Sequence, residues 1–503
     1  MPIRHLTAAA VLSFPLLCHA GFSNGQAAAY VLGQSSFTAS EAAPTSSRYW
    51  GARDVAVDAR SGKAFVIDVW ASRILRYSNV DALALGAAPE AVLGQTSLNV
   101  GGSGTSASQL NTPYGLALEA TGALWVADTN NNRVVRFTAA LTCASGAPAN
   151  LALGQPDFTS SGAAASSSGM NAPKALHLDA SGTLWVADTG NNRVLRFANA
   201  AGKTTGASAD GELGQPDFTT SATGSGPSGM NAPSGVCADA AGHLFVADTL
   251  NSRVLRFDSA ATKADADGSS ADHVLGQPTL SGGYSSVSSQ RLNSPENLSL
   301  DSAGTLAVAD TNNRRCLLWA DAASKGDFAA ATAVLGQSDF DSQGGGLTAS
   351  RFSDPSSAKF DTAGRLWLVD GSARRVLRFD PSILLGSNFQ PQVASTRLRR
   401  SAVFMITNSG EMPARFTLVA LVKVHGQAKV RARWLLDGAN ATAAFRSGTG
   451  VTRMLSQGES ATLICKPRRL DKNARKLAVK IRLTATSVNY PTLSAVGGAR
   501  LRL

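Results

Sequence analysis

The chain lacks an apolar run long enough to cross a membrane as a helix. The run at residues 6–17 has about 12 residues, whereas a spanning helix takes about 20. It follows Arg4 and His5, and Cys18-His19-Ala20 then places small residues before Gly21. This order is typical of a secretory signal, so we expect cleavage after Ala20 and a product that is secreted or held in the periplasm or cell envelope.

Cysteine is scarce, and its spacing suggests no compact disulfide framework. Cys18 belongs to the predicted signal, which leaves Cys143, Cys237, Cys316 and Cys465. We interpret them as isolated buried thiols, since free cysteine packs as a small hydrophobe. An exported chain could still pair them, and the sequence leaves that open.

Motifs of catalysis and metal binding are missing as well. The chain has no G-x-S-x-G elbow, no H-E-x-x-H and no phosphate loop. Beyond the signal there are four histidines, at His177, His243, His273 and His425, and their positions in the repeat described below differ. A zinc site built from several histidines is therefore hard to assemble, and we expect no metal and no cofactor.

Charged residues make up only 16% of the chain, and the two signs are unevenly distributed. Residues 389–503 carry 20 Lys and Arg against four acids, a net charge of +16, whereas residues 21–388 carry 25 against 31, a net charge of −6. Such opposite balances predict two domains with different surroundings.

Two short sequences recur along the first of these parts. Leu-Gly-Gln places its glycine at Gly33, Gly94, Gly154, Gly214, Gly276 and Gly336. Between these marks runs a second signature, LWVADTNNNRVVRF at 124–137, with weaker copies such as AFVIDVWASRILRY at 64–77. Its aspartates are Asp68, Asp128, Asp188, Asp248, Asp310 and Asp370, about 60 residues apart. The period is the signature of a repeat fold.

Each repeat reads as four short antiparallel strands. In the second copy the expected strands are 115–119, 124–127, 133–137 and 151–155, separated by Gly, Asn and Asp turns. Four strands per radial unit is the blade of a β-propeller. The first Leu-Gly-Gln strand, at 30–34, precedes the first three-strand core, and none follows the last core. We therefore predict an all-β, six-bladed propeller whose N-terminal strand completes the sixth blade.

These residues resemble a known family. The pattern P-x-G-L-A-L-D-x-x-G-x-L-W-V-A-D-T-x-N-N-R-V is similar to the NHL repeat, and with V-L-G-Q-P-D-F it resembles NHL-repeat proteins exported by bacteria. The resemblance covers about residues 30–385 and implies a six-bladed propeller. Propellers of this kind include RNA-binding domains, a zinc-dependent lyase acting on peptidyl hydroxyglycine, and extracellular adhesion modules, so the fold does not decide the function.

Residues 389–503 predict a separate β-sandwich after a linker at 389–396. Apolar and β-branched runs alternate there with turns such as Asp437-Gly438, and the segment loosely resembles Ig-like modules. Its basic residues cluster at 397–400, 429–433, 466–476 and the C-terminus. The predicted domains are thus a signal at 1–20, a propeller at 21–388 and a basic sandwich at 389–503.

We expect the sandwich to attract anionic envelope polymer. Nucleic acid is disfavoured, because no recognition motif for it is present.

The residues common to all blades have a structural explanation. An aspartate at the end of the second strand can accept backbone N–H groups of the turn that follows. Its partner arginines recur at Arg73, Arg133, Arg193, Arg253, Arg315 and Arg375. We expect function instead where the repeats differ.

Two positions vary from blade to blade, the first on the first, innermost strand and the second just before that strand. One reads Ala56, Ala117, His177, Cys237, Ser299 and Lys359; the other reads Arg53, Tyr114, Lys174, Ser234, Glu296 and Ser356. His177 and Lys359 are three blades apart, hence across the axis, and this set could titrate or bind an anion. The alternative is that these side chains only fill space between blades.

Two apolar residues, Trp70 and Leu250, interrupt the polar turns between the second and third strands. With the long Ser- and Gly-rich loops they could contact a protein or carbohydrate partner, or pack beneath a loop. The sequence favours a non-enzymatic binding or scaffold protein, with a lyase or hydrolase at the channel mouth as the alternative.

Overall fold

A computed structural model describes residues 21–41, 48–58, 60–266 and 268–381, and the strands of the C-terminal part as backbone. The chain divides into two units, one formed by Phe22–Pro381 and one that contains Ser382–Leu503. The predicted signal, its cleavage site and the predicted boundary at residue 388 lie outside the described residues. Among the described helices, none has the length and apolarity of a membrane span.

The first unit is a ring of six four-stranded antiparallel sheets, as predicted. Blade 1 comprises β2 (Ala52–Asp58), β3 (Lys63–Asp68), β4 (Arg73–Tyr77) and β5 (Ala91–Leu93). Blade 2 comprises β6 (Gly115–Leu118), β7 (Leu124–Asp128), β8 (Arg133–Phe137) and β9 (Leu151–Leu153). Blade 3 comprises β10 (Ala175–Leu178), β11 (Leu184–Asp188), β12 (Arg193–Phe197) and β13 (Gly211–Leu213).

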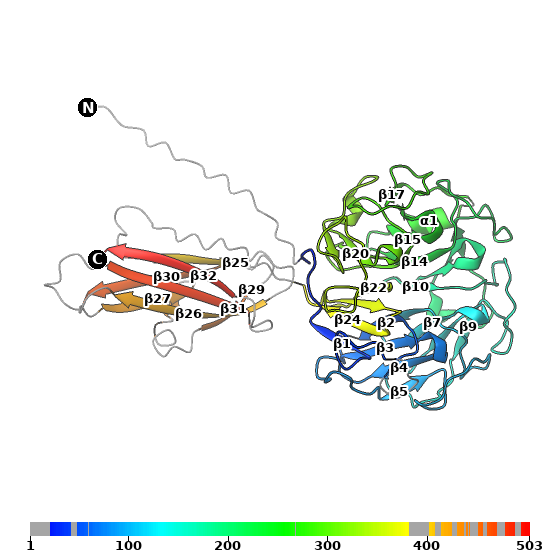
Figure 1. Ribbon diagram of the computed structural model, residues 1–503, viewed down its shortest axis with the longest axis horizontal. Coiled ribbons are helices and arrows are strands. Elements are labelled where there is room, and N and C mark those ends of the chain that lie inside the picture. Colours follow the sequence, from blue (N-terminus) through cyan, green and yellow to red (C-terminus); the bar gives the residue numbers. More distant parts are fainter. Residues whose placement is uncertain are drawn as a thin grey trace. The chain divides into compact units, whose positions relative to one another are not determined.

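The second half of the ring repeats this order. Blade 4 comprises β14 (Pro233–Ala238), β15 (Leu244–Asp248), β16 (Arg253–Phe257) and β17 (His273–Leu275). Blade 5 comprises β18 (Pro295–Leu300), β19 (Leu306–Asp310), β20 (Arg315–Trp319) and β21 (Ala333–Leu335). Blade 6 comprises β22 (Pro355–Phe360), β23 (Leu366–Asp370) and β24 (Arg375–Phe379). Figure 1 shows β2, β10, β14 and β22 around the middle of the ring and β5, β9 and β17 at its rim.

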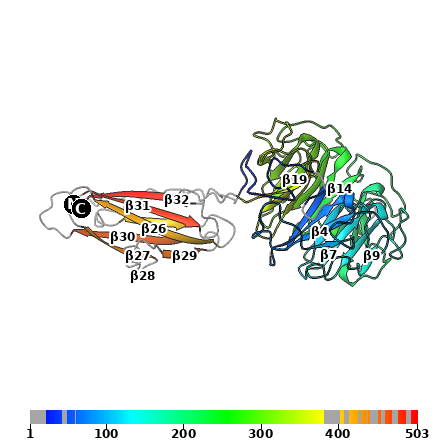
Figure 2. The ribbon, with the colours of Figure 1, turned by 60° about the horizontal axis from the view of Figure 1, so that its bottom comes forward.

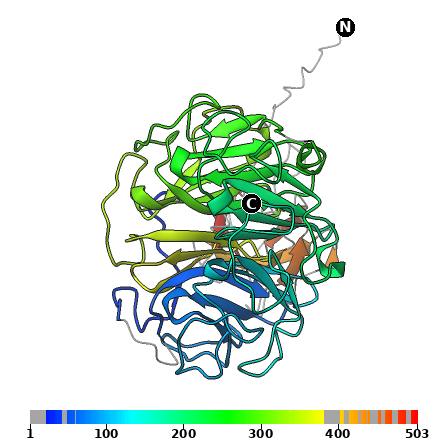
Figure 3. The ribbon, with the colours of Figure 1, turned by 90° about the vertical axis from the view of Figure 1, so that its right-hand side faces the viewer.

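The ring is closed by β1 (Tyr30–Leu32), which supplies the fourth strand of blade 6. It pairs antiparallel with β24, with Val31 opposite Leu377. The blue first strands and the yellow last strands accordingly lie side by side in Figures 1 and 3. The predicted latch is confirmed, and it covers a sheet edge that would otherwise be exposed.

In the ranges of the propeller that the structure describes, helical structure is confined to short connections. Five 3₁₀ turns join the second and third strands of blades 1 to 5, at Val69–Ala71, Thr129–Asn131, Thr189–Asn191, Thr249–Asn251 and Thr311–Asn313. Two more follow third strands, at Ala200–Gly202 and Ala322–Ser324, and α1 spans Ala260–Ala264.

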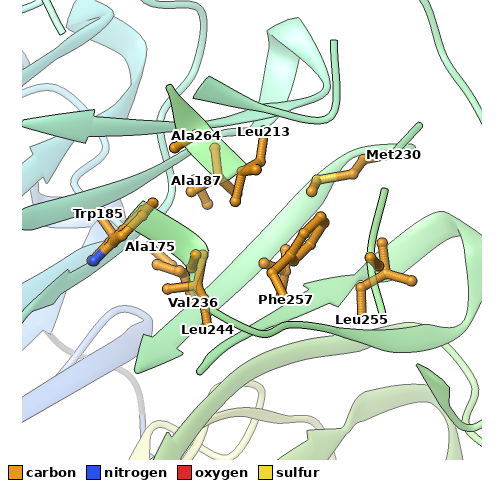
Figure 4. Close-up of a cluster of buried hydrophobic side chains, with 14 of the residues drawn as sticks. Ala175, Trp185, Ala187, Leu213, Met230, Val236, Leu244, Leu255, Phe257 and Ala264 are labelled. Atoms are coloured by element: carbon orange, nitrogen blue, oxygen red, sulfur yellow. The ribbon is translucent and has the colours of Figure 1, made fainter. Parts of the chain in front are cut away.

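The core lies between neighbouring blades. In Figure 4, Ala175 and Trp185 of blade 3 face Val236, Leu244 and Phe257 of blade 4, and all are buried. Both faces of each sheet are covered in this way, so apolar residues follow one another within the strands instead of alternating with polar ones. Burial of this apolar surface is the main stabilising contribution to the ring.

The repeated aspartate and arginine anchor the long loops. In blade 2 the Asp128 carboxylate accepts the Arg133 Nε–H at 2.7 Å, and Arg133 also donates to the carbonyl oxygens of Thr105 and Phe158. Asp128 Oδ1 accepts the backbone N–H of Asn111 at 2.6 Å. The structural role is as predicted, but this amide belongs to the loop before the first strand, not to the turn after Asp128. The reason is that the end of the second strand lies beside the entrance of the first.

The Leu-Gly-Gln signature has a similar role, because the strand ends at its leucine and glutamine leaves the sheet. Gly154 has a φ of 87°, in the left-handed region. Gln155 then donates from Nε2 to the carbonyl oxygens of Asn132 and Gly162. The repeated glutamine therefore ties the loop to the neighbouring turn.

In the C-terminal unit the described backbone forms eight strands in two antiparallel sheets. One sheet has the order β25 (Ala402–Thr407), β30 (Ser460–Arg469), β27 (Val430–Leu436), β28 (Ala439–Asn440). The other has the order β29 (Val451–Leu455), β26 (Ala414–Val424), β31 (Ala478–Ser487), β32 (Ser494–Arg502). Figure 2 shows β26, β31 and β32 alongside one another. The Ig-like character of this unit stays a prediction.

Candidate functional site

A cavity of about 460 Å³ lies on the axis of the propeller. The first strands of all six blades line it, together with the turns that follow some of them. The residues predicted to approach the channel are therefore placed together here: Ala56, Ala117, His177, Cys237, Ser299 and Lys359.

The cavity wall is mainly apolar, and at the variable strand position its polar side chains lie on one side of the ring. Leu116, Leu176 and Leu298 are among its aliphatic lining residues. Blades 1 and 2 contribute alanine at the variable position, whereas blades 3 to 6 contribute imidazole, thiol, hydroxyl and ammonium groups. A concave apolar site with a few polar groups is the usual form of a small-molecule site.

Lys359 is the largely buried cation of this cavity, whereas Arg60, which also lines it, is 63% exposed and paired with Asp58. The Nζ of Lys359 lies 3.9 Å from Oδ2 of Asp54, and 17% of the lysine side chain is exposed. That distance is too long for a hydrogen bond. In the described part of the chain no group accepts a hydrogen bond from Nζ, so its three N–H donors remain available to a ligand.

Asp54 lies below Lys359 and is fully buried. It accepts hydrogen bonds from the N–H of Leu116 at 2.8 Å, the N–H of Val55 at 2.9 Å and Oγ of Ser357 at 2.6 Å. Burial raises its pKa, against the opposing effects of Lys359 and of these donors. Asp54 does not line the cavity itself, but its charge attracts the ammonium group of Lys359.

Sequence reasoning missed Asp54 and the residues bonded around it. Ser357 Oγ accepts a hydrogen bond from Asn297 Nδ2 at 3.2 Å, which joins blades 5, 6 and 1. The sequence did contain a signal for this network. Where blades 1, 5 and 6 have Asp54, Asn297 and Ser357, blades 2, 3 and 4 have Gly115, Ala175 and Gly235. Three polar residues among three small ones mark an asymmetric polar network.

His177 stays neutral in this setting. Burial, and then the charge of Lys359 across the channel, lower the pKa of its imidazole to about 4. The predicted proximity of the two residues is consistent with this effect. A neutral imidazole offers one donor and one acceptor to a ligand near pH 7.

Cys237 and Ser299 complete the polar side. Burial raises the pKa of the Cys237 thiol well above its usual value, so the thiol stays protonated. Ser299 Oγ accepts the N–H of Phe360 at 2.9 Å. Its own O–H is then oriented for donation to another acceptor.

The acids around the wide mouth are bonded to their own blades. Glu119 accepts from Arg136 Nε at 2.6 Å and from Trp125 Nε1 at 2.7 Å. Asp361 accepts from Arg365 Nε and Trp367 Nε1 in the same way. These carboxylates hold hairpins together, and their ion pairs with Arg136 and Arg365 offset their negative charge.

The second set of variable residues fills the opposite end of the channel. Arg53 Nη1 lies 3.4 Å from Glu296 Oε2, and the cations of Arg53 and Lys174 each lie 5.2 Å from the centre of the Tyr114 ring. Ser234 donates to the carbonyl of Glu296, and Ser356 to that of Arg53. The space left is about 10 Å³, about one water molecule. The structure brings these residues together as a plug.

Trp70 and Leu250 are placed on the surface, with 61% and 60% of their area exposed. They belong to blades 1 and 4, on opposite sides of the ring. Trp70 lies against Gly51, where a Cβ would meet its Cδ1 at 2.4 Å. Trp50 beside it is 43% exposed and was not predicted. None of these three residues lines the axial cavity or the small space at its other end.

No three side chains of His, Cys, Asp or Glu gather as a metal site within the ranges that the structure describes. All four cysteines beyond residue 20 are free, and Cys237, Cys316 and Cys465 are buried. The interpretation of these cysteines as isolated thiols agrees with this arrangement.

Comparison with known proteins identifies the repeat. The NHL-repeat family model matches residues 110–137 and 230–257, which contain the first three strands of blades 2 and 4. No curated protein matches the chain.

Solved structures show similarity at low identity. A selenomethionine-substituted virginiamycin B lyase from Staphylococcus aureus is 13% identical over 86% of this chain and 98% of that chain, with a TM-score of 0.38. A gluconolactonase from Xanthomonas campestris is 16% identical over 66% and 86%, with a TM-score of 0.38. The WD40 propeller domain of Doa1 is 9% identical over 70% and 96%, with a TM-score of 0.40. Scores below 0.5 say nothing about the activity of this chain.

Proposed function

We propose that this propeller of NHL repeats is a binding module, which takes a small molecule with an acidic group and an apolar body into its axial cavity. The basic C-terminal unit would tether the exported chain to anionic material of the cell envelope. The observation that carries the first part is Lys359, whose ammonium group lies in a mainly apolar cavity at 3.9 Å from Asp54 and without a hydrogen-bond acceptor among the described residues.

The cavity is suited to bind a ligand with one polar end. Lys359 would donate to a carboxylate, and charge-assisted hydrogen bonds of this kind are about twice as strong as neutral ones. His177 and Ser299 would bond other oxygen atoms of the ligand, while its apolar body would lie against the alanines of blades 1 and 2. The plug at Arg53 and Glu296 would make the wide mouth the entrance.

A calorimetric titration with a panel of small aromatic and aliphatic carboxylic acids tests this proposal. We expect Lys359→Met to weaken binding of the best ligand by about tenfold or more, because it removes a charged donor. Lys203→Met, on the surface of blade 3, is the matched control. Equal affinities of both variants and the wild type would overturn the assignment of Lys359.

The alternative is a lyase or hydrolase in the same cavity, and His177 favours it because a neutral imidazole can accept a proton at pH 7. It would require turnover of a ligand found by the titration. If His177→Gln abolished turnover but kept binding, the enzyme would replace the binding module. If the ligand remained chemically unchanged, the binding module would stand.

The tethering role is supported by the net charge of +16 in residues 389–503. Attraction between exposed charges is screened at high ionic strength. Association with envelope material should therefore be lost at about 0.5 M NaCl. Association that survives unchanged would contradict an electrostatic tether.

A further inference from the structure

Basic residues of the C-terminal unit are paired with one another across the strands. In the first sheet Arg431 lies opposite Arg468, and Arg433 lies opposite Lys466. Opposed residues share a face of an antiparallel sheet, as do residues two apart along a strand. These four residues therefore form one block of positive charge, which we name lattice A.

The second sheet contains a larger block. Lys423 of β26 lies opposite Lys480 of β31, which lies opposite Arg500 of β32. Arg482 and Arg502 each lie two positions further along β31 and β32 and share this face. We name these five residues lattice B.

Each lattice lies on the face opposite a largely apolar one, and lattice A shares its face with Leu435 and Ile464. Cys465, whose side chain is buried, pairs with Trp434 on the face of its sheet opposite lattice A. The face opposite lattice B holds Val422, Ile481 and Leu501. Alternation of this kind is typical of an antiparallel sheet that has one face on a core.

Like charges directly opposite each other destabilise a sheet. None of the eight strands contains an aspartate or glutamate, so no acid on the strands compensates either lattice. Neighbouring positions are about 4.8 Å apart across strands and about 7 Å apart along them. An arrangement that costs stability and is present on both sheets indicates a bound counter-charge with closely repeated anionic groups.

We infer that the C-terminal unit binds a linear anionic polysaccharide through lattices A and B. This inference rests on the tethering role proposed above and names its surface and its ligand class. No Phe, Tyr or Trp lies on either lattice face, so the stacking that single-stranded nucleic acid uses is missing. In the predicted sandwich the lattices occupy opposite outer faces. A flat membrane meets one of these at a time, whereas a flexible chain can follow both.

The test uses the full chain without residues 1–20 and polygalacturonate as the probe, with uncharged dextran as the blank. The lattice variant combines Lys423→Gln, Lys480→Gln and Arg500→Gln. The matched control removes three charges from the same unit with Lys472→Gln, Arg475→Gln and Lys476→Gln, in a segment outside the described residues. Because opposed charges are relieved, the lattice variant should fold with an unchanged or higher Tm.

We expect the lattice variant to bind polygalacturonate at least about tenfold more weakly at low salt and to show a smaller salt dependence. The control should lose less than about threefold. An equal loss of affinity in both variants would show that the lattices are not the binding surface, although net charge could still provide the tether. No binding by the wild-type chain at low salt would overturn the tether itself. Tighter binding to single-stranded DNA or to phosphatidylglycerol vesicles than to polygalacturonate would contradict the assignment of a polysaccharide as the ligand.

Discussion

Single residues that depart from the repeat create the polar side of the cavity. The same strand position is alanine in two blades and His177, Cys237, Ser299 or Lys359 in the others. Sequence comparison between blades could identify these residues, because each differs from the residue at the equivalent position of the other five blades. It could not identify the pairing of Lys359 with Asp54 or the bond of Asp54 to Ser357, which depend on how closely strands of different blades approach at the axis.

The common aspartate can be tested at the same scale. Asp128→Asn leaves the Arg133 guanidinium buried without its counter-charge. We expect the free energy of unfolding to fall by about 3–5 kcal/mol, the usual cost of breaking a buried ion pair. Urea denaturation measures it, with the exposed Asp341→Asn as the control. A loss below about 1 kcal/mol would mean that the pair is not structural.

His177 predicts a dependence of stability on pH. Its pKa is about 4 in the folded chain, whereas an unfolded histidine has a pKa of about 6.5. Between these values the unfolded state binds more protons, so this contribution to stability is complete above about pH 6.5 and is lost as the pH falls toward 4. The difference in unfolding free energy between wild type and His177→Gln should shrink over this window. A constant difference would show that His177 titrates normally when folded.

At the scale of elements, the latch strand explains how the ring closes. Its prediction needed only the count of six Leu-Gly-Gln strands and the position of the first one. The hydrogen bonds of Gln34 after β1 could not be predicted, because one acceptor is Arg374, 340 residues away. Local pattern determines strands, whereas ring closure determines which loops they meet.

Gly33 tests the latch directly. It follows β1 with a φ of 85°, and a Cβ there would lie 2.0 Å from the Tyr49 ring. Gly33→Ala should therefore lower the free energy of unfolding by about 2 kcal/mol or more, through strain and displacement of β1. Gly162→Ala is the control, since its Cβ would meet nothing within 4 Å. A neutral Gly33→Ala would mean that β1 adds little to closure.

At the scale of the whole molecule, the two units differ in charge and in the kind of binding site that they offer. The propeller holds a closed-ended axial cavity, and the other unit concentrates basic residues on both sheets. The charge imbalance predicted this division, but the pairing of like charges across strands needed the strand register. Small-molecule capture and envelope attachment would then be independent properties of one chain.

Their independence gives a prediction for the intact chain. Lys359→Met should leave polygalacturonate binding unchanged, and the lattice variant should leave carboxylate binding unchanged, because each acts in a different unit. Paired titrations of both variants with both ligands measure this. A change of more than about threefold in the unaltered property would mean that the two sites are coupled.

The most direct test of the central claim is a high-resolution crystal structure of the protein purified from its native host without added ligand. The account predicts density for a small molecule in the axial cavity, with an acidic oxygen within hydrogen-bond distance of Lys359 Nζ. A cavity filled only by water, together with a carboxylate panel that binds no better to wild type than to Lys359→Met, would contradict it.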